Sequence, residues 1–134
     1  PAELFLENIT LQGGDRQQFI AECGKRRSNY ACQIKAEQDG FIADIDAYQI
    51  GIAGVHLGVG RNKTTDDVCS DAGMIFHKRT GDAVKKGDPI MDVYGKDTAC
   101  LVTASDIIKK AIRYAADKPE GRPLVFKEIT AADL

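Results

Sequence analysis

The sequence lacks features that would each point to a particular class of protein. No apolar run approaches the ~20 residues that a membrane-spanning helix needs, and Glu3 and Glu7 interrupt the first apolar stretch, so we predict no signal peptide. Neither sign of charge is in excess, because 18 basic side chains against 20 acidic ones give a formal net charge of −2. Such a balance provides no field to attract a polyanion. We therefore expect neither a membrane nor nucleic acid as a partner.

Closely spaced metal or disulfide ligands are also missing. The four cysteines form no C-x-x-C pair, and the two histidines lie far apart in the sequence. We therefore expect free thiols, as in a cytoplasmic protein, and neither a metal site nor a cofactor. The cysteines are Cys23, Cys32, Cys69 and Cys100.

What is present is the composition of one globular domain. The chain has 134 residues, of which 43% are hydrophobic and 28% charged, enough for a core and too few for two ordinary domains. It starts at Pro1 rather than Met, and Leu4 to Leu6 resemble the middle of an element. We therefore expect a piece of a longer protein.

The first 45 residues predict two short helices followed by a hairpin. Residues 3–12 have helical periodicity, Gly13-Gly14 stops it, and Asp15 can cap a second short helix. A polar connector follows over residues 23–29. The segments 31–37 and 41–45 alternate as strands, and the Asp39-Gly40 step between them predicts a β-hairpin.

The segment 46–59 predicts a glycine-rich helix with Asp46 as its N-cap. Its small residues share one narrow face, and apolar side chains occupy most of the remainder. A helix that is apolar nearly all round is expected to be buried. Each glycine costs about 0.5–1 kcal/mol relative to alanine, so this stripe predicts close approach by another backbone. The stripe consists of Ala47, Gly51, Gly54 and Gly58.

The remainder predicts a second pair of strands, a long helix and a final strand. The strands are expected at 73–77 and 89–94, with Val84 inward between glycine turns at Gly81 and Gly87. We expect the helix to start at Thr103, with Asp106 in the capping-box position, and to include 107–115. Pro119 and Gly121 end it, and 124–126 form the closing strand. This order predicts a compact α+β domain with a small, mostly antiparallel sheet.

No catalytic or substrate-binding residue can be assigned from the residues alone. The stretch 58–61 has the form G-x-G-R, but it follows a helix, so neither a dinucleotide fingerprint nor a P-loop fits. Thr64, Thr65 and Lys63 are the only compact phosphate candidates, and Asp66 and Asp67 beside them would repel an anion. The sequence offers no activated nucleophile and no acid–base pair in a defined pocket.

An ordered set of short motifs resembles the C-terminal region of the pyrimidine nucleoside phosphorylases, the family that includes thymidine phosphorylase. The resemblance covers about residues 4–129. In order, the motifs are Gln12-Gly13-Gly14-Asp15, Asp39-Gly40-Phe41-Ile42, Ile50-Gly51, Leu57-Gly58-Val59-Gly60-Arg61, and the block from Gly73 through Gly81-Asp82-Ala83-Val84 to Gly87 with the last helix.

The resemblance implies an α/β-hammerhead fold and a glycosyltransferase of nucleoside salvage, in which phosphate displaces a pyrimidine base and leaves a pentose 1-phosphate. It implies that residues 1–22 end the catalytic α/β domain and that 23–134 form the C-terminal hammerhead domain. The family's base- and phosphate-binding residues lie upstream, so this chain is expected to be inactive alone. The parent enzyme would be a homodimer and this piece a monomer, with phosphate and nucleoside reached through the upstream domains.

The resemblance also implies a loop that tightens when the two domains close. The candidate closure residues are Gly58, Gly60, Arg61, Asn62 and Lys63. The connector at 23–29 departs from the family, which has more proline there. The preferred nucleoside, thymidine or uridine, stays open.

Two other functions fit parts of the sequence. The stretch Thr80 to Ile90 is similar to the G-D-x-V-x-x-G turn of biotinyl or lipoyl carrier domains, for which Lys96 would be the nearest modifiable lysine. A stand-alone interaction module is the other alternative.

Overall fold

A computed structural model of the chain describes residues 2–61, 63–121, 123 and 125–130. Four helices and six strands follow one another along these described residues. They are α1 (Ala2–Leu11), α2 (Arg16–Glu22), β1 (Tyr30–Lys35), β2 (Gly40–Ile45), α3 (Ala47–Leu57), β3 (Gly73–Phe76), β4 (Ala83–Val84), β5 (Pro89–Gly95), α4 (Thr98–Ala111) and β6 (Ile112–Ala115).

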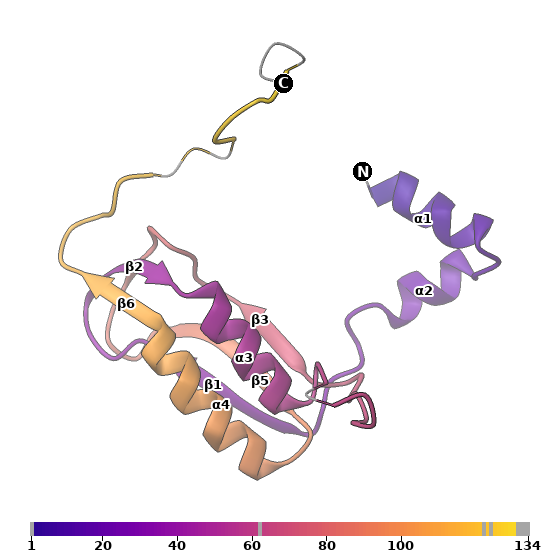
Figure 1. Cartoon of the computed structure of the whole chain (residues 1–134), viewed down its shortest axis with the longest axis horizontal. Helices are drawn as coiled ribbons and strands as arrows, with labels where there is room; N and C mark the ends of the chain where they lie inside the picture. Colours follow the sequence, from indigo (N-terminus) through magenta and orange to yellow (C-terminus); the bar gives the residue numbers. More distant parts are fainter. Residues whose placement is uncertain (1, 62, 122, 124, 131–134) are drawn as a thin grey trace.

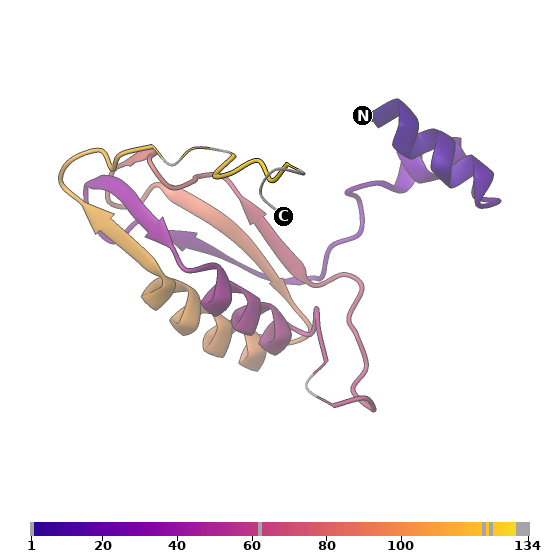
Figure 2. The ribbon, with the colours of Figure 1, turned by 45° about the horizontal axis from the view of Figure 1, so that its top comes forward.

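The strands form two three-stranded sheets, in the orders β1-β5-β3 and β4-β2-β6, and all four strand pairings are antiparallel. Helices α3 and α4 lie side by side against one face of the strands (Figure 2). The chain is therefore an α+β domain, as predicted. The side chains with the least exposure lie between these layers and are Ile34, Ile42, Leu57, Ile90, Met91, Val93 and Ile108.

Helices α1 and α2 stand apart from this body, at the far end of the connector (Figure 1). They contact each other through the rings of Phe5 and Phe19, whose centroids are 5.5 Å apart, and through an ion pair of Arg16 with Glu3 at 2.7 Å. Neither helix contains a buried residue. Asp15 caps α2 as predicted, since its carboxylate accepts hydrogen bonds from the amides of Gln17 and Gln18.

The predicted hairpin between residues 31 and 45 is wrong. Its two strands exist, but β1 pairs with β5 while β2 pairs with β4 and β6, so they belong to different sheets. The Asp39-Gly40 step has a different structural role. Gly40 has φ +139°, and a Cβ there would lie 2.4 Å from the carbonyl oxygen of Ala115 in β6. Asp39 accepts a hydrogen bond from the amide of Lys86 instead of closing a two-residue turn.

Helix α3 begins after the predicted cap, because Asp46 accepts hydrogen bonds from the amides of Tyr48 and Gln49. The predicted burial on all sides is wrong, since only Ala53, Gly54 and Leu57 are buried. The expected close backbone approach is not seen at Gly51 or Gly54 either; within the stripe it occurs only at Gly58, whose carbonyl accepts from the Cys69 amide. A Cβ at Gly51 would meet nothing within 4 Å, and one at Gly54 would meet only the Met74 methyl group, at 3.6 Å.

The boundaries of α4 also differ from the prediction. The helix starts at Thr98 with Asp97 as its cap, and Asp97 accepts from the Cys100 amide at 2.7 Å. Thr103 is inside the helix, where its hydroxyl donates to the carbonyl of Ala99. Residues 112–115 leave the helix and pair with β2 as β6. Extended β-branched and aromatic side chains here gain cross-strand partners that a longer helix would not provide.

Other predicted features are confirmed. Val84 is buried at 4% exposure, and Gly81 and Gly87 both have positive φ. The four cysteines are free thiols. The predicted closing strand at 124–126 is wrong where it can be checked, since Val125 and Phe126 have no strand structure; Leu124 lies outside the described residues. None of the described helices is long and apolar enough to cross a membrane.

Candidate functional site

Three separate segments meet at the end of the body where the connector arrives from α2 (Figures 1 and 2). They are the connector 23–29, the loop 58–72 after α3, and the turn 95–97 between β5 and α4. We call this region the connector end. Ser28 links the segments, because its amide donates to the carbonyl of Asp71 at 2.9 Å and its hydroxyl donates to the carbonyl of Gly95 at 2.6 Å.

The connector is further held by Arg27. Its guanidinium lies over the ring of Tyr94 at 5.5 Å from the centroid, and its Nη1 donates to the Tyr94 hydroxyl at 3.3 Å. Cation–π contacts of this kind stabilise an exposed pair only modestly. Together with Ser28 they nevertheless fix where the chain enters the body from upstream.

Gly58 is the fixed base of the loop. It ends α3 in the left-handed conformation, with φ +99°, which glycine adopts without steric cost. Its carbonyl accepts from the Cys69 amide at 2.8 Å. A Cβ at Gly58 would lie 3.3 Å from Cys69 Cβ and 3.5 Å from Lys96 Cδ. The loop and the β5–α4 turn therefore both approach this glycine closely.

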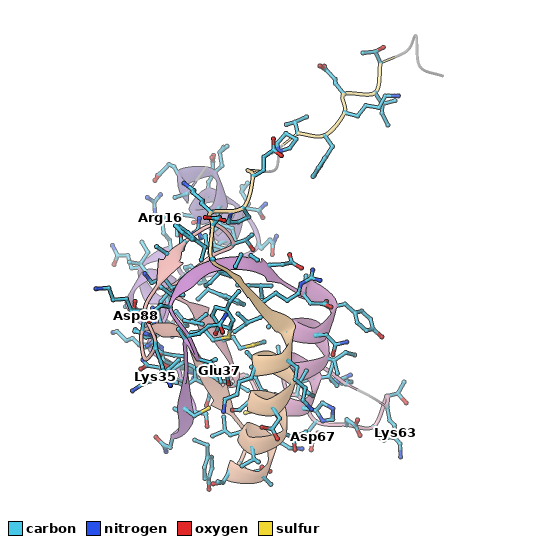
Figure 3. All side chains as sticks on the ribbon, turned by 90° about the vertical axis from the view of Figure 1, so that its left-hand side faces the viewer. Arg16, Lys35, Glu37, Lys63, Asp67 and Asp88 are labelled. Atoms are coloured by element: carbon cyan, nitrogen blue, oxygen red, sulfur yellow. The ribbon has the colours of Figure 1, made fainter. Side chains whose placement is uncertain are left out.

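The other predicted closure residues come after Gly58 along the loop. A Cβ at Gly60 would lie 3.1 Å from Val55 Cγ2, so the chain folds back on α3 at this point. Arg61 and Lys63 are exposed, and Figure 3 shows the Lys63 side chain reaching outward from the loop. Asn62 lies outside the described residues. The structure thus places four of the five predicted residues together.

The electrostatics of the loop do not suit an anion. The Lys63 amide donates to the carboxylate of Asp66 at 2.9 Å, and the Asp66 amide donates back to the Lys63 carbonyl at 3.0 Å. A backbone donor that a phosphate would need is thus already bound to a carboxylate of the same loop. Asp67, also exposed, adds a second negative charge. The loop can contact a neighbouring surface, but it offers no ready phosphate cradle.

A polar cluster on the open face of the β1-β5-β3 sheet was not predicted. Asp92 accepts a hydrogen bond from Gln33 Nε2 at 2.9 Å and lies 2.8 Å from His77 Nε2. The bond from Gln33 and then that from His77 hold the pKa of Asp92 below its usual value. The strand register pairs Gln33 with Asp92, so the correct pairing of β1 with β5 would have revealed the cluster.

This cluster has the groups of an acid–base pair but not the surroundings of one. The side chains of His77 and Asp92 are 38% and 27% exposed on a flat sheet face. Solvent there screens the charges and competes for their hydrogen bonds. The arrangement suits a cross-strand contact that stabilises the sheet.

The carrier interpretation fails on the position of its lysine. Carrier domains present the modified lysine at the tip of a hairpin between two strands. Here Lys96 follows β5 and directly precedes Asp97, the cap of α4. Its amide donates to the carbonyl of Leu57 at 3.1 Å. The backbone of Lys96 is thus held at the connector end and is not the tip of a hairpin, although the residue is exposed.

Taken together, the fold and the connector end define a small α+β domain that helices α1 and α2 join through the connector. The sequence model of the pyrimidine nucleoside phosphorylase C-terminal domain matches residues 41–115, from β2 to the end of β6. The chain belongs to this family.

Curated relatives carry the match beyond that range. The chain is similar to a pyrimidine-nucleoside phosphorylase of Staphylococcus haemolyticus (31% identity over 79% of this chain and 23% of that protein). It is also similar to a pyrimidine-nucleoside phosphorylase of Geobacillus stearothermophilus, with 26% identity over 96% of this chain and 29% of that protein. A thymidine phosphorylase of Mycoplasma genitalium is 33% identical over 67% of this chain and 21% of that protein. The chain therefore spans about a quarter of the length of these relatives.

Proposed function

We propose that this domain serves an enzyme of nucleoside salvage in which phosphate displaces a pyrimidine base from a nucleoside and leaves a pentose 1-phosphate. The observation that carries the proposal is the family match over residues 41–115, which covers most of the packed part of the domain. The names of the relatives supply the substrate class. Thymidine and uridine both fit these names.

The domain's part in that reaction is proposed to be indirect. Stabilising the transition state requires donors aimed at phosphate and groups that support charge on the departing base. The loop with the most suitable residues binds its own carboxylate. We therefore place the catalytic and substrate-binding residues upstream, and assign to this domain the positioning of the catalytic α/β domain and the geometry of closure.

The division of the chain follows the same proposal. Residues 1–22 end the catalytic domain, and residues 23–134 form the C-terminal domain with its expected hammerhead topology. The exposure of Leu4, Phe5, Leu11 and Ile20, at 54–81%, supports this boundary, because two isolated short helices do not bury enough apolar surface to be stable alone. The intact enzyme is proposed to be a cytoplasmic homodimer, and this chain by itself a monomer.

A chimera tests the positional role. This chain would replace the matching 29% of the Geobacillus stearothermophilus enzyme, and a second variant would lack that region. We expect the chimera to release pyrimidine base from nucleoside and phosphate, and the truncated enzyme to lose activity because its α/β domain is misplaced. Full activity of a folded truncated enzyme would contradict the proposal.

The closure loop has its own test in the same chimera. Hydrogen exchange over residues 58–72 would be compared with and without phosphate and nucleoside, with α3 (Ala47–Leu57) as the internal control. We expect the loop to exchange faster than α3 without substrate, because its side chains are exposed, and to slow when both substrates are bound. Exchange that substrate leaves unchanged in an active chimera would remove the loop from the closure mechanism.

A further inference from the structure

Ser28 differs from its neighbours in the segment that leads from α2 into the body. Of residues 10–31, all of which the structure describes, it alone is not exposed. Its hydroxyl donates to the carbonyl of Gly95 at 2.6 Å and accepts from the amide of Tyr30 at 3.0 Å. Its own amide donates to the carbonyl of Asp71 at 2.9 Å. The side chain must therefore be short and must both donate and accept, which the hydroxyl groups of serine and threonine allow.

Gly95 is a rigid anchor for this hydroxyl. The residue is buried, and a Cβ there would lie 2.5 Å from Cys100 Sγ and 3.2 Å from Leu57 Cδ2. Backbone packed this closely against α3 and α4 cannot move without displacing both helices. The carbonyl that accepts from Ser28 is therefore fixed to the core. Through its amide, Ser28 holds one arm of the loop 58–72 against that anchor.

Three backbone hydrogen bonds complete a ring around the base of the loop. One ties the β5–α4 turn to the last residue of α3, and two tie the arms of the loop together. Ser28 joins the second arm of the loop to the turn, so it is the link of the ring that the connector contributes. The three bonds run from the amide of Lys96 to the carbonyl of Leu57 (3.1 Å), from Cys69 to Gly58 (2.8 Å) and from Ala72 to Cys69 (3.2 Å).

The outer part of the loop depends on this ring. Among its described residues 61 and 63–68, Asp66 alone is not exposed, and it bonds to Lys63 of the same loop. Side chains that are exposed in this way add little packing to fix the loop. The direction in which the loop leaves the body is therefore set at its base, by the ring that Ser28 completes.

We propose that Ser28 is a positioning residue, which sets where the loop 58–72 lies relative to the connector and so couples the order of the loop to the position of the proposed catalytic domain. The inference rests on the proposed function, since it takes 58–72 as the loop that becomes ordered when substrates bind. Coupling between two sites is reciprocal, so a loop ordered by substrate also restrains the connector. Ser28 itself acts through the loop and not on the substrate.

The chain alone tests the link between Ser28 and the loop. Ser28→Ala removes both bonds of the hydroxyl and leaves the backbone amide in place. We expect the amides of Cys69 and Ala72, which Ser28 does not bond directly, to exchange with solvent several-fold faster. Ser28→Thr keeps a hydroxyl and should restore slow exchange. Equal exchange of these two amides in the folded Ser28→Ala and unaltered chains would overturn the proposal.

Two controls separate this effect from a general loss of stability. Ser70→Ala removes a hydroxyl of the same loop that donates to the Asp71 carboxylate at 3.2 Å, and it should leave the exchange of Cys69 and Ala72 unchanged. The amides of β5 report on the whole body and should exchange equally in all chains. If Ser28→Ala accelerates β5 as well, Ser28→Cys provides the comparison, because it keeps the size of the side chain and weakens its hydrogen bonds. Unchanged exchange of the loop in that variant would overturn the proposal.

The chimera with the Geobacillus stearothermophilus enzyme tests the coupling itself. With phosphate and nucleoside bound, exchange should slow in the connector 23–29 as well as in the loop, and Ser28→Ala should abolish the slowing in the connector. We expect kcat to fall several-fold while the KM of each substrate changes about two-fold or less, because Ser28 acts on closure and not on substrate binding. A residue with a merely structural role would leave the response of the connector to substrate intact.

The outcomes distinguish this inference from the proposed function. A folded, unaltered chimera that releases no base would contradict the proposed function, and exchange in the chain alone would still decide whether Ser28 positions the loop. An active chimera in which Ser28→Ala changes neither kcat nor the response of the connector would contradict the coupling and leave the proposed function intact.

Discussion

At the scale of single residues, the glycines differ in what they do. Gly40 combines φ +139° with a Cβ position 2.4 Å from a backbone oxygen of β6, whereas Gly51 has open space. Gly40→Ala should lower the free energy of unfolding by about 1–3 kcal/mol, because it adds backbone strain and a collision. Gly51→Ala should raise it by about 0.5–1 kcal/mol. Urea denaturation measures both, and equal effects would contradict the assigned geometry.

The ionisation of Asp92 makes the stability of the fold depend on pH, and the direction of this dependence follows from its lowered pKa. Hydrogen bonds from Gln33 and His77 lower its pKa from the ordinary 3.8. A lowered pKa means that the contribution to stability is present above the unfolded-state value and is lost as the pH falls through the folded-state value. Gln33→Ala should raise the pKa of Asp92, as an NMR titration of its carboxyl would show. An Asp92 that titrates at 3.8 in the unaltered chain would refute the cluster.

At the scale of elements, the start of α4 makes a clear prediction. Asp97→Ala removes the side chain that accepts from the Cys100 amide and should cost about 0.5–2 kcal/mol. Thr103→Ala, within the helix, should change stability by a few tenths of a kcal/mol at most, because alanine has the higher helix propensity. Thermal unfolding of the two variants decides between these caps. A larger loss of stability in Thr103→Ala than in Asp97→Ala would indicate that the helix starts at Thr103, as expected from the sequence.

The elements also show which parts of the fold the sequence could predict. Asp15 and Asp46 were correctly identified as caps because a cap depends on amides two and three residues away. The partner strand of β1 was not predicted correctly, because an Asp-Gly step predicts a hairpin from local geometry alone. The actual constraint on Gly40 comes from Ala115, 75 residues later in the sequence.

The ends of α4 and the candidate site likewise depend on contacts between residues that are distant in the sequence. Residues 112–115 fit a helical stripe, and only the presence of β2 makes them a strand. The candidate closure loop comes from the family resemblance, and the structure adds its hydrogen bond to the connector and its close approach to the β5–α4 turn. The cluster of Gln33, His77 and Asp92 depends on register between strands, which local patterns do not contain.

At the scale of the whole molecule, the chain is organised around two ends. One end receives the connector and presents the loop that follows Gly58. The other holds the β2–β6 sheet, where Arg113 of β6 pairs with Asp44 of β2. Because α1 and α2 join the body at the first end, a movement of the proposed catalytic domain would reach the body through Ser28 and the loop. This organisation fits a domain that positions an active site formed elsewhere.

The most direct test of that account is a turnover assay on the chain alone. The purified 134-residue chain would be incubated with thymidine or uridine and phosphate, and free base would be measured against an intact phosphorylase. The account predicts no release of base above the uncatalysed rate, because the described loop offers neither a phosphate cradle nor a group to support the departing base. Turnover at a rate comparable with the intact enzyme would mean that the active site lies within this chain.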